Sequence, residues 1–188
     1  LDQSQYEEIQ YVGKRSVNNS CFYREYVLGE DSPGLRATSM IISQALQQPF
    51  FTEMRTNQQL GYIVWSYQNN RDETLYLTFV IQSGEFTADD VNQRADDFIA
   101  STPEFLASMD AKTFQQLKDS AIEQLEKKPM SIRERANKLK TFIFEHDADF
   151  QRDDKTIVAL ETLDQAAAVD LLSKTVSKET RRMMNCLM

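Results

Sequence analysis

Apolar and polar positions alternate along residues 75–82, a period of two that predicts a strand with one buried face. Residues 61–67 show the same pattern, and the polar run 68–72 between the two segments predicts a turn. We therefore expect these strands to form a hairpin. Further segments rich in aromatic and β-branched residues predict three more strands, 6–15, 20–28 and 180–188, with a turn at 17–19.

Elsewhere apolar residues recur at helical spacing. Pro49 is predicted to interrupt the first helix, since proline cannot donate an amide hydrogen bond, and residues 50–55 to form a second short helical piece. The apolar positions expected to face the core are Thr38, Ile41, Ile42, Ala45 and Leu46; Val91, Ala95, Phe98 and Ile99; Phe114, Leu117, Ala121 and Leu125; Ala136, Leu139 and Ile143; and Ala168, Leu171 and Leu172.

The order of these elements predicts the fold class. Three side-chain pairs have the spacing of a helix start: Thr87 with Asp90, Ser131 with Glu134, and Thr162 with Gln165. Strands come first, then a helix, a hairpin, several helices and a last strand. Such segregation predicts an α+β fold in which helices cover one face of a mixed or antiparallel sheet. We find no repeat or linker, so residues 1–188 are predicted to be a single domain.

Composition and net charge limit the classes of partner that this chain can bind. The chain is 41% hydrophobic and 27% charged, typical of a globular protein, and its net charge is −8. That charge argues against nucleic acid and against an anionic membrane as partners. No apolar run is long enough to span a bilayer. The start at Leu1 suggests a piece of something longer. Cys21 and Cys186 have no metal-binding or redox spacing, and two buried thiols are favoured over a disulfide.

One segment carries candidate chemistry, because Arg55 and Tyr62 stand seven positions apart where a helix gives way to a strand. A phenol can donate a neutral hydrogen bond to a carbonyl oxygen, and a guanidinium can bind carbonyls or a carboxylate through several donors. Gly61 leaves room beside Tyr62 for another backbone to approach. The alternative is structural: Arg55 would cap helix carbonyls, and Tyr62 would cover a sheet edge.

Several segments together resemble the carboxy-terminal domain of pitrilysin and insulysin, inverted-motif zinc peptidases of the M16 family. The resemblance is strongest over 54–66, where Gln59, Leu60 and Gly61 frame the tyrosine. The other similar segments are 18–20 with the aromatic strand that follows, 49–51, 79–83 and, less specifically, 127–131.

This resemblance implies four related α+β domains in two halves that close around a peptide or an unfolded polypeptide. It implies that Arg55 and Tyr62 bind substrate, opposite a zinc ion held by the amino-terminal half. It also implies a soluble protein of the cytoplasm or of a bacterial periplasm, without deciding between them.

The chain itself departs from the family's catalytic half. It has one histidine, His146, so an HxxEH zinc motif is absent from it and no metal is expected in this piece. His146 lies among carboxylates that are adjacent in sequence, a pattern typical of a solvated helix end. We therefore expect an inactive fragment of a zinc metalloendopeptidase. The alternative is a non-catalytic assembly subunit or interaction module with the same fold.

Overall fold

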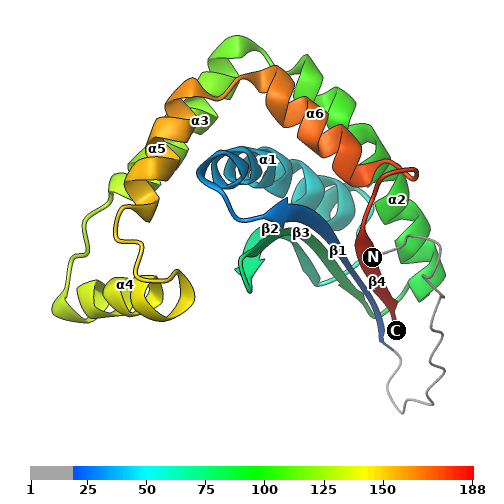
Figure 1. Cartoon of the computed structure of the whole chain (residues 1–188). Coiled ribbons are helices and arrows are strands. Elements are labelled where there is room, and N and C mark those ends of the chain that lie inside the picture. Colours follow the sequence, from blue (N-terminus) through cyan, green and yellow to red (C-terminus); the bar gives the residue numbers. More distant parts are fainter. Residues whose placement is uncertain (1–18) are drawn as a thin grey trace.

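The computed structural model describes residues 19–188, which fold as one sheet and a layer of helices (Figure 1). The strand predicted for residues 6–15 and most of the turn predicted for 17–19 lie outside the described residues. In chain order the elements are β1 (Ser20–Glu30), α1 (Pro33–Phe51), the π-helix η2 (Thr52–Asn57), β2 (Ile63–Arg71), β3 (Thr74–Ser83), α2 (Ala88–Ser108), α3 (Ala111–Glu126), α4 (Ile132–Glu145), α5 (Arg152–Thr162), α6 (Gln165–Val176) and β4 (Met183–Leu187).

The sheet has the order β2-β3-β1-β4, and every neighbouring pair is antiparallel. The predicted hairpin is confirmed as β2 and β3, although β2 continues to Arg71 and the turn is shorter than expected. Asp72 and Glu73 form it with φ angles of 47° and 58°, the left-handed pair that matches the twist of a two-residue hairpin. Cys186 pairs with Tyr23 in the ladder, and both cysteines are half-buried.

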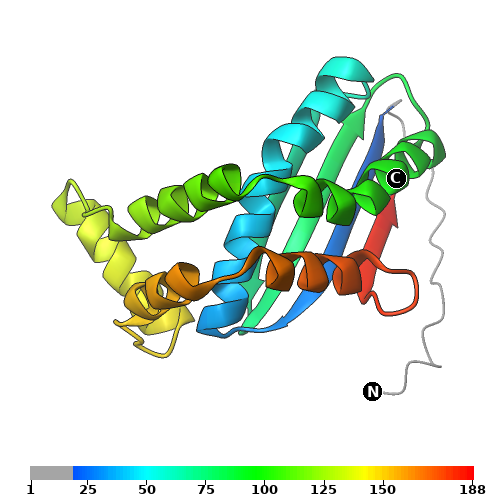
Figure 2. The ribbon, with the colours of Figure 1, turned by 90° about the horizontal axis from the view of Figure 1, so that it is seen from above.

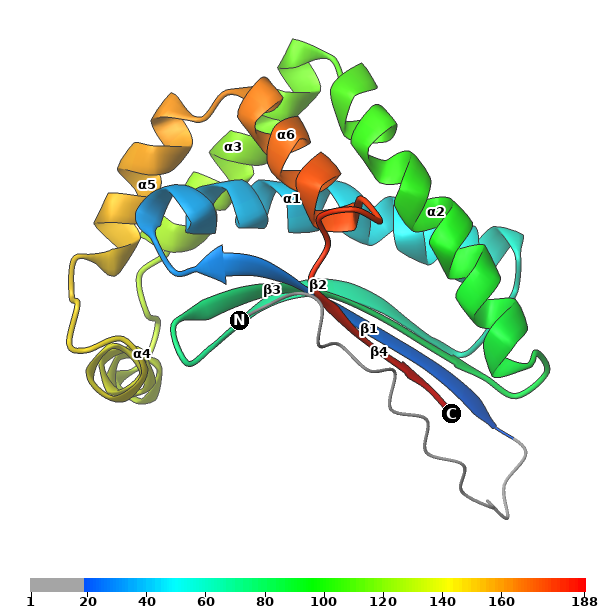
Figure 3. The ribbon, with the colours of Figure 1, turned by 45° about the vertical axis from the view of Figure 1, so that its right-hand side comes forward.

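Within residues 19–188, helices cover one face of this sheet and leave the other face open, which confirms the predicted α+β architecture (Figure 3). The helix α1 runs along the strands at the β2 side of the sheet, and α2 and α6 lie over the remaining strands (Figure 2). Phe50 of α1 packs edge-on against Phe79 of β3 and Phe98 of α2, with ring centroids 5.1 and 5.3 Å apart. Burying one such side chain stabilises the fold by about 1.5–3 kcal/mol, so these contacts hold α1 and α2 on the sheet.

The open face carries a carboxylate whose hydrogen bonds are all internal. Glu25 of β1 accepts hydrogen bonds from Tyr23 (3.0 Å), Asn69 (3.2 Å) and Thr78 (3.2 Å), and Arg71 forms an ion pair with it. Burial raises the pKa of Glu25, but the hydrogen bonds from its neighbours outweigh that effect and hold the pKa below its ordinary value. The cluster ties three strands together.

Two local predictions are wrong. The helix α1 is not interrupted at Pro49 but runs through it to Phe51, and η2 continues directly from there. The sequence pattern also missed α5, whose last residue is Thr162. Thr162 therefore does not cap the next helix; Asp164 precedes α6 instead.

A third prediction is wrong in a more informative way. The helix α4 begins where expected, since the Ser131 hydroxyl accepts a hydrogen bond from the Glu134 amide at 3.1 Å. Yet Ala136, Leu139 and Ile143, which were expected to face the core, are exposed. Phe142 is the one residue of α4 that is buried. The helix lies apart from the sheet, at the end of the molecule beyond α5 (Figure 1).

Candidate functional site

The backbone between α1 and β2 contains an unusual turn. In η2 the amide of Gln58 donates to the carbonyl of Glu53 at 3.0 Å, five residues back, and Leu60 donates to Met54 at 2.9 Å. The side chains of Met54 and Leu60 are buried and anchor the segment in the core. Gln59 lies between them with φ of 53°, a left-handed conformation that ends the helix. Single π-helical turns are frequent at functional sites.

Gly61 lets the chain pass very close to the neighbouring strand. A Cβ placed on Gly61 would lie 1.9 Å from the carbonyl oxygen of Gln82 and 2.8 Å from its carbonyl carbon. Both atoms belong to the backbone of β3, so no side-chain rotation would relieve the overlap. Glycine is therefore required at this position for the approach of two backbones. The backbone that approaches Gly61 is that of β3; the predicted room beside Tyr62 for a peptide stays a prediction.

Arg55 projects from η2 and lies against two aromatic rings. Its guanidinium carbon is 5.2 Å from the ring centroid of Phe51 and 5.2 Å from that of Tyr62. Its Nη1 donates to the backbone carbonyl oxygen of Tyr62 at 2.9 Å. This hydrogen bond is with the strand entry. The structural alternative was a bond from Arg55 to a helix carbonyl, and none is present within residues 19–188. Stacking and the hydrogen bond together fix the guanidinium while its side chain remains exposed.

Tyr62 lies just before β2, an edge strand of the sheet, and 81% of the residue is exposed. Its ring rests on Arg55, and its hydroxyl has no hydrogen-bond partner among residues 19–188. The structure therefore brings the two predicted site residues into direct contact and leaves polar atoms of both at the surface. The sequence analysis placed Phe51 in a family-like segment but gave it no role at the site, although a spacing of four residues along a helix places it beside Arg55.

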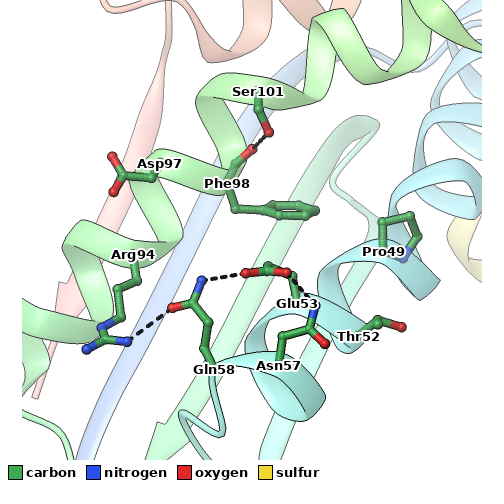
Figure 4. A pocket seen from close by; sticks show the side chains of 9 residues that line it. All are labelled: Pro49, Thr52, Glu53, Asn57, Gln58, Arg94, Asp97, Phe98 and Ser101. Carbon is green, nitrogen blue, oxygen red and sulfur yellow. Dashed lines mark hydrogen bonds between the residues drawn. The ribbon is translucent and has the colours of Figure 1, made fainter.

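The carboxylate of Glu53 stabilises η2 through hydrogen bonds with neighbouring side chains (Figure 4). Glu53 accepts hydrogen bonds from the side chains of Asn57 at 2.7 Å and Gln58 at 2.8 Å. Arg94 of α2 in turn donates to Gln58 at 3.3 Å, and its guanidinium lies 4.8 Å from the ring centroid of Phe86. Sequence reasoning missed this network, because none of its members forms a recognised motif.

The same residues line a groove of about 530 Å³ between η2 and α2. Glu53 and Gln58 use their polar atoms on each other, and Phe98 supplies an apolar wall (Figure 4). The lining residues of the groove are Pro49, Thr52, Glu53, Asn57, Gln58, Arg94, Asp97, Phe98 and Ser101.

This network predicts a pH dependence. Hydrogen bonds from Gln58 and Asn57 hold the pKa of Glu53 below its ordinary value in the folded protein. The stabilisation is therefore complete above the ordinary glutamate pKa and is lost as the pH falls through the lowered folded value. We expect carbon NMR to show Glu53 titrating below an unperturbed glutamate, and Gln58→Ala to raise that midpoint. An unchanged midpoint in Gln58→Ala would mean that this hydrogen bond does not govern the carboxylate.

No group of three or more His, Cys, Asp or Glu side chains within residues 19–188 is arranged to hold a metal ion. His146 follows α4 as its C-cap residue, at the helix end that the sequence predicted. Within the same residues, no helix is both long and apolar enough to cross a membrane.

Comparisons with known proteins place this geometry in context. A family model described as PQQ synthase PqqF-like, C-terminal lobe domain 4, matches residues 41–140, more than half of the chain and including Arg55 and Tyr62. The A-factor-processing enzyme of Saccharomyces cerevisiae is 26% identical over 161 residues, which are 86% of this chain and 16% of that protein. The chain therefore spans about a sixth of that relative's length.

Solved structures share the fold. The crystal structure of pitrilysin matches with a TM-score of 0.80 and 22% identity, over 92% of this chain and 18% of that one. A chain from Bordetella parapertussis, described as an inactive peptidase domain, matches with a TM-score of 0.67 and 11% identity, over 94% of this chain and 96% of that one.

Proposed function

Because the chain belongs to the PqqF-like family of C-terminal lobe domains, and is thus the C-terminal domain of an M16 peptidase, we propose that it binds peptide substrate and closes a chamber opposite a zinc site. The observation that supports this proposal is the contact between Arg55 and Tyr62. An arginine fixed between two rings and a tyrosine with an uncommitted hydroxyl lie together on an exposed strand entry.

Each side chain has a distinct proposed task. Arg55 uses one N–H on the carbonyl of Tyr62, so its remaining donors are available for carbonyls of an extended peptide or for its carboxylate. Because the guanidinium is already held, binding would lose little side-chain entropy. The Tyr62 phenol would donate to the oxygen of the scissile carbonyl, where negative charge develops as the bond is attacked.

We place the zinc outside this chain. A single histidine and the absence of a suitable ligand cluster within residues 19–188 do not fit a zinc site. In the proposed enzyme the amino-terminal half of the same polypeptide would hold the metal, which would supply an activated water when bound. This chain supplies orientation and hydrogen bonds.

The second candidate function is a non-catalytic assembly or interaction module. The Bordetella parapertussis chain, described as inactive, has the same fold, so the fold by itself does not decide. The retained arrangement of Arg55 and Tyr62 favours the enzyme, since a purely structural subunit has no use for a phenol without a partner. The discriminating observation is whether the upstream sequence carries HxxEH and a later glutamate.

The first test replaces Arg55 with alanine in the complete polypeptide. Arg55 is proposed to hold the peptide backbone before and during the reaction, so we expect KM to rise about tenfold. Steady-state kinetics on several unstructured peptides measures this. Arg182→Ala provides a matched control, because Arg182 is exposed near β4, at the opposite edge of the sheet. An unchanged KM in a folded Arg55→Ala enzyme would contradict the substrate-binding role.

A second test concerns the metal. After dialysis of the isolated chain against a weak chelator, we expect far less than one zinc per chain by elemental analysis. The reason is that the chain has a single histidine and that residues 19–188 contain no cluster of metal-binding side chains. One tightly held zinc per chain would contradict this expectation and would require a new assignment for His146.

A further inference from the structure

The helix α4 has few ties to the rest of the domain. Figures 1 and 2 show it beyond α5, away from the sheet. Its contacts are local: Lys138 pairs with Asp153 of α5 at 2.6 Å, and Phe142 packs edge-on against Phe150 with centroids 6.2 Å apart. Apart from Thr141, which is half-buried, the other residues of the helix are exposed to solvent.

That exposed surface carries an ordered apolar stripe. Ile132, Ala136, Leu139 and Ile143 follow the spacing i, i+4, i+7 and i+11, which places them on one face of the helix. Ile132 is 90% exposed, Leu139 41% and Ile143 47%. This is the pattern of a buried helix face, yet none of these four residues is buried within residues 19–188. Helices that dock into grooves present such anchors.

Positive charge borders the stripe. Residues 127–140 contain six Lys or Arg residues against the single acid Glu134, a net charge of +5 in a chain whose total is −8. On a helical projection, Arg133 and Lys140 lie on one side of the stripe, and Arg135 and Lys138 on the other. The surface that covers this stripe should therefore be apolar at its centre and acidic at its rim.

We propose that the α4 stripe, Ile132, Ala136, Leu139 and Ile143, docks into an acidic-rimmed apolar groove on another domain of the same polypeptide. The family is the fourth domain of a lobed protein, and the chain spans 16% of the A-factor-processing enzyme and 18% of the pitrilysin chain. Other domains of such a polypeptide are therefore available to cover the α4 stripe. Two copies of the stripe facing each other would bring like charges together, which costs free energy. An anionic membrane would attract α4 but repel the rest of the chain.

Zero-length carbodiimide cross-linking of the complete polypeptide tests this proposal. We expect mass spectrometry to find Lys128 or Lys140 joined to Asp or Glu residues outside residues 1–188. Deuterium uptake of α4 should also be slower in the complete polypeptide than in the isolated 188-residue chain. Ile132→Glu should reduce the cross-link yield about tenfold, since it puts a charge in the apolar centre. Val158→Glu should leave the yield unchanged, because Val158 is 60% exposed on α5, outside the stripe.

Three results would overturn the proposal. Cross-links that join only separate copies, detected by mixing isotopically labelled and unlabelled protein, would identify self-association. Co-sedimentation of the complete polypeptide with phosphatidylglycerol vesicles through α4 would identify a membrane surface. A third result would be equal deuterium uptake of α4 in the complete polypeptide and in the isolated chain, with no cross-link from α4 to any residue outside residues 1–188. That result would mean that α4 stays exposed. None of these measurements uses peptidase activity, so they remain independent of the roles proposed for Arg55 and Tyr62.

Discussion

Replacing Gly61 with alanine is expected to destabilise the domain by about 1–3 kcal/mol or more, the cost of overpacking. The added Cβ would lie 1.9 Å from a backbone carbonyl oxygen of β3, so strand β2 or the turn before it must move. Such a shift would also displace the hydrogen-bond acceptor of Arg55, which is the carbonyl oxygen of Tyr62, the residue after Gly61. Urea unfolding of the isolated chain, followed by circular dichroism, measures the change in free energy.

Gly34→Ala is the matched control for this substitution. Gly34 lies in the first turn of α1, and a Cβ there would meet no atom within 4 Å. Alanine reduces the conformational freedom of the unfolded chain, so we expect no loss and a gain of up to about 1 kcal/mol. Equal stability of the Gly61→Ala and wild-type proteins would show that the strands can separate without cost, contrary to the packing described.

Tyr62→Phe in the complete enzyme is expected to lower kcat by roughly 10²–10³, with a smaller change in KM. The hydroxyl has no partner within residues 19–188, so its removal should leave the fold intact. In the proposed reaction the phenol donates more strongly as the carbonyl oxygen becomes charged. An interaction that strengthens in the transition state is expressed in kcat. Single-turnover and steady-state kinetics on several peptides measure it.

The control for this change is Tyr67→Phe, the same substitution five residues along on β2, which should retain full kcat. Thermal melts of both variants must match the wild-type melt before rates are compared. If Tyr62→Phe is folded and keeps full kcat on every peptide, the phenol has no role in the transition state. Tyr62 would then be an exposed residue at a sheet edge, and the structural alternative would hold.

Much of the architecture was determined locally along the chain. The alternation in residues 75–82 predicted β3, because a strand half-buried in a sheet has a period of two. The spacing of Ser131 and Glu134 predicted the start of α4, because a capping hydrogen bond needs only residues three apart. Patterns of this kind depend on residues close together in the sequence, so they predict structure without knowledge of the rest of the molecule.

The sequence also determined the candidate site as a segment. Arg55, Gly61 and Tyr62 were identified by residue type, spacing and resemblance, and the family match includes all three. The substrate-binding role of Arg55 and Tyr62 stays a prediction.

Only the tertiary structure decided how these parts meet. The continuation of α1 through Pro49 into η2 depends on packing against the sheet, which outweighs the missing amide donor. The need for glycine at position 61 arises from a carbonyl of β3, 21 residues away in sequence. The exposure of the α4 stripe is the clearest case. The apolar periodicity of a helix indicates that one face can be buried. It does not indicate which surface covers that face, because the covering surface belongs to the assembled fold and not to the helix.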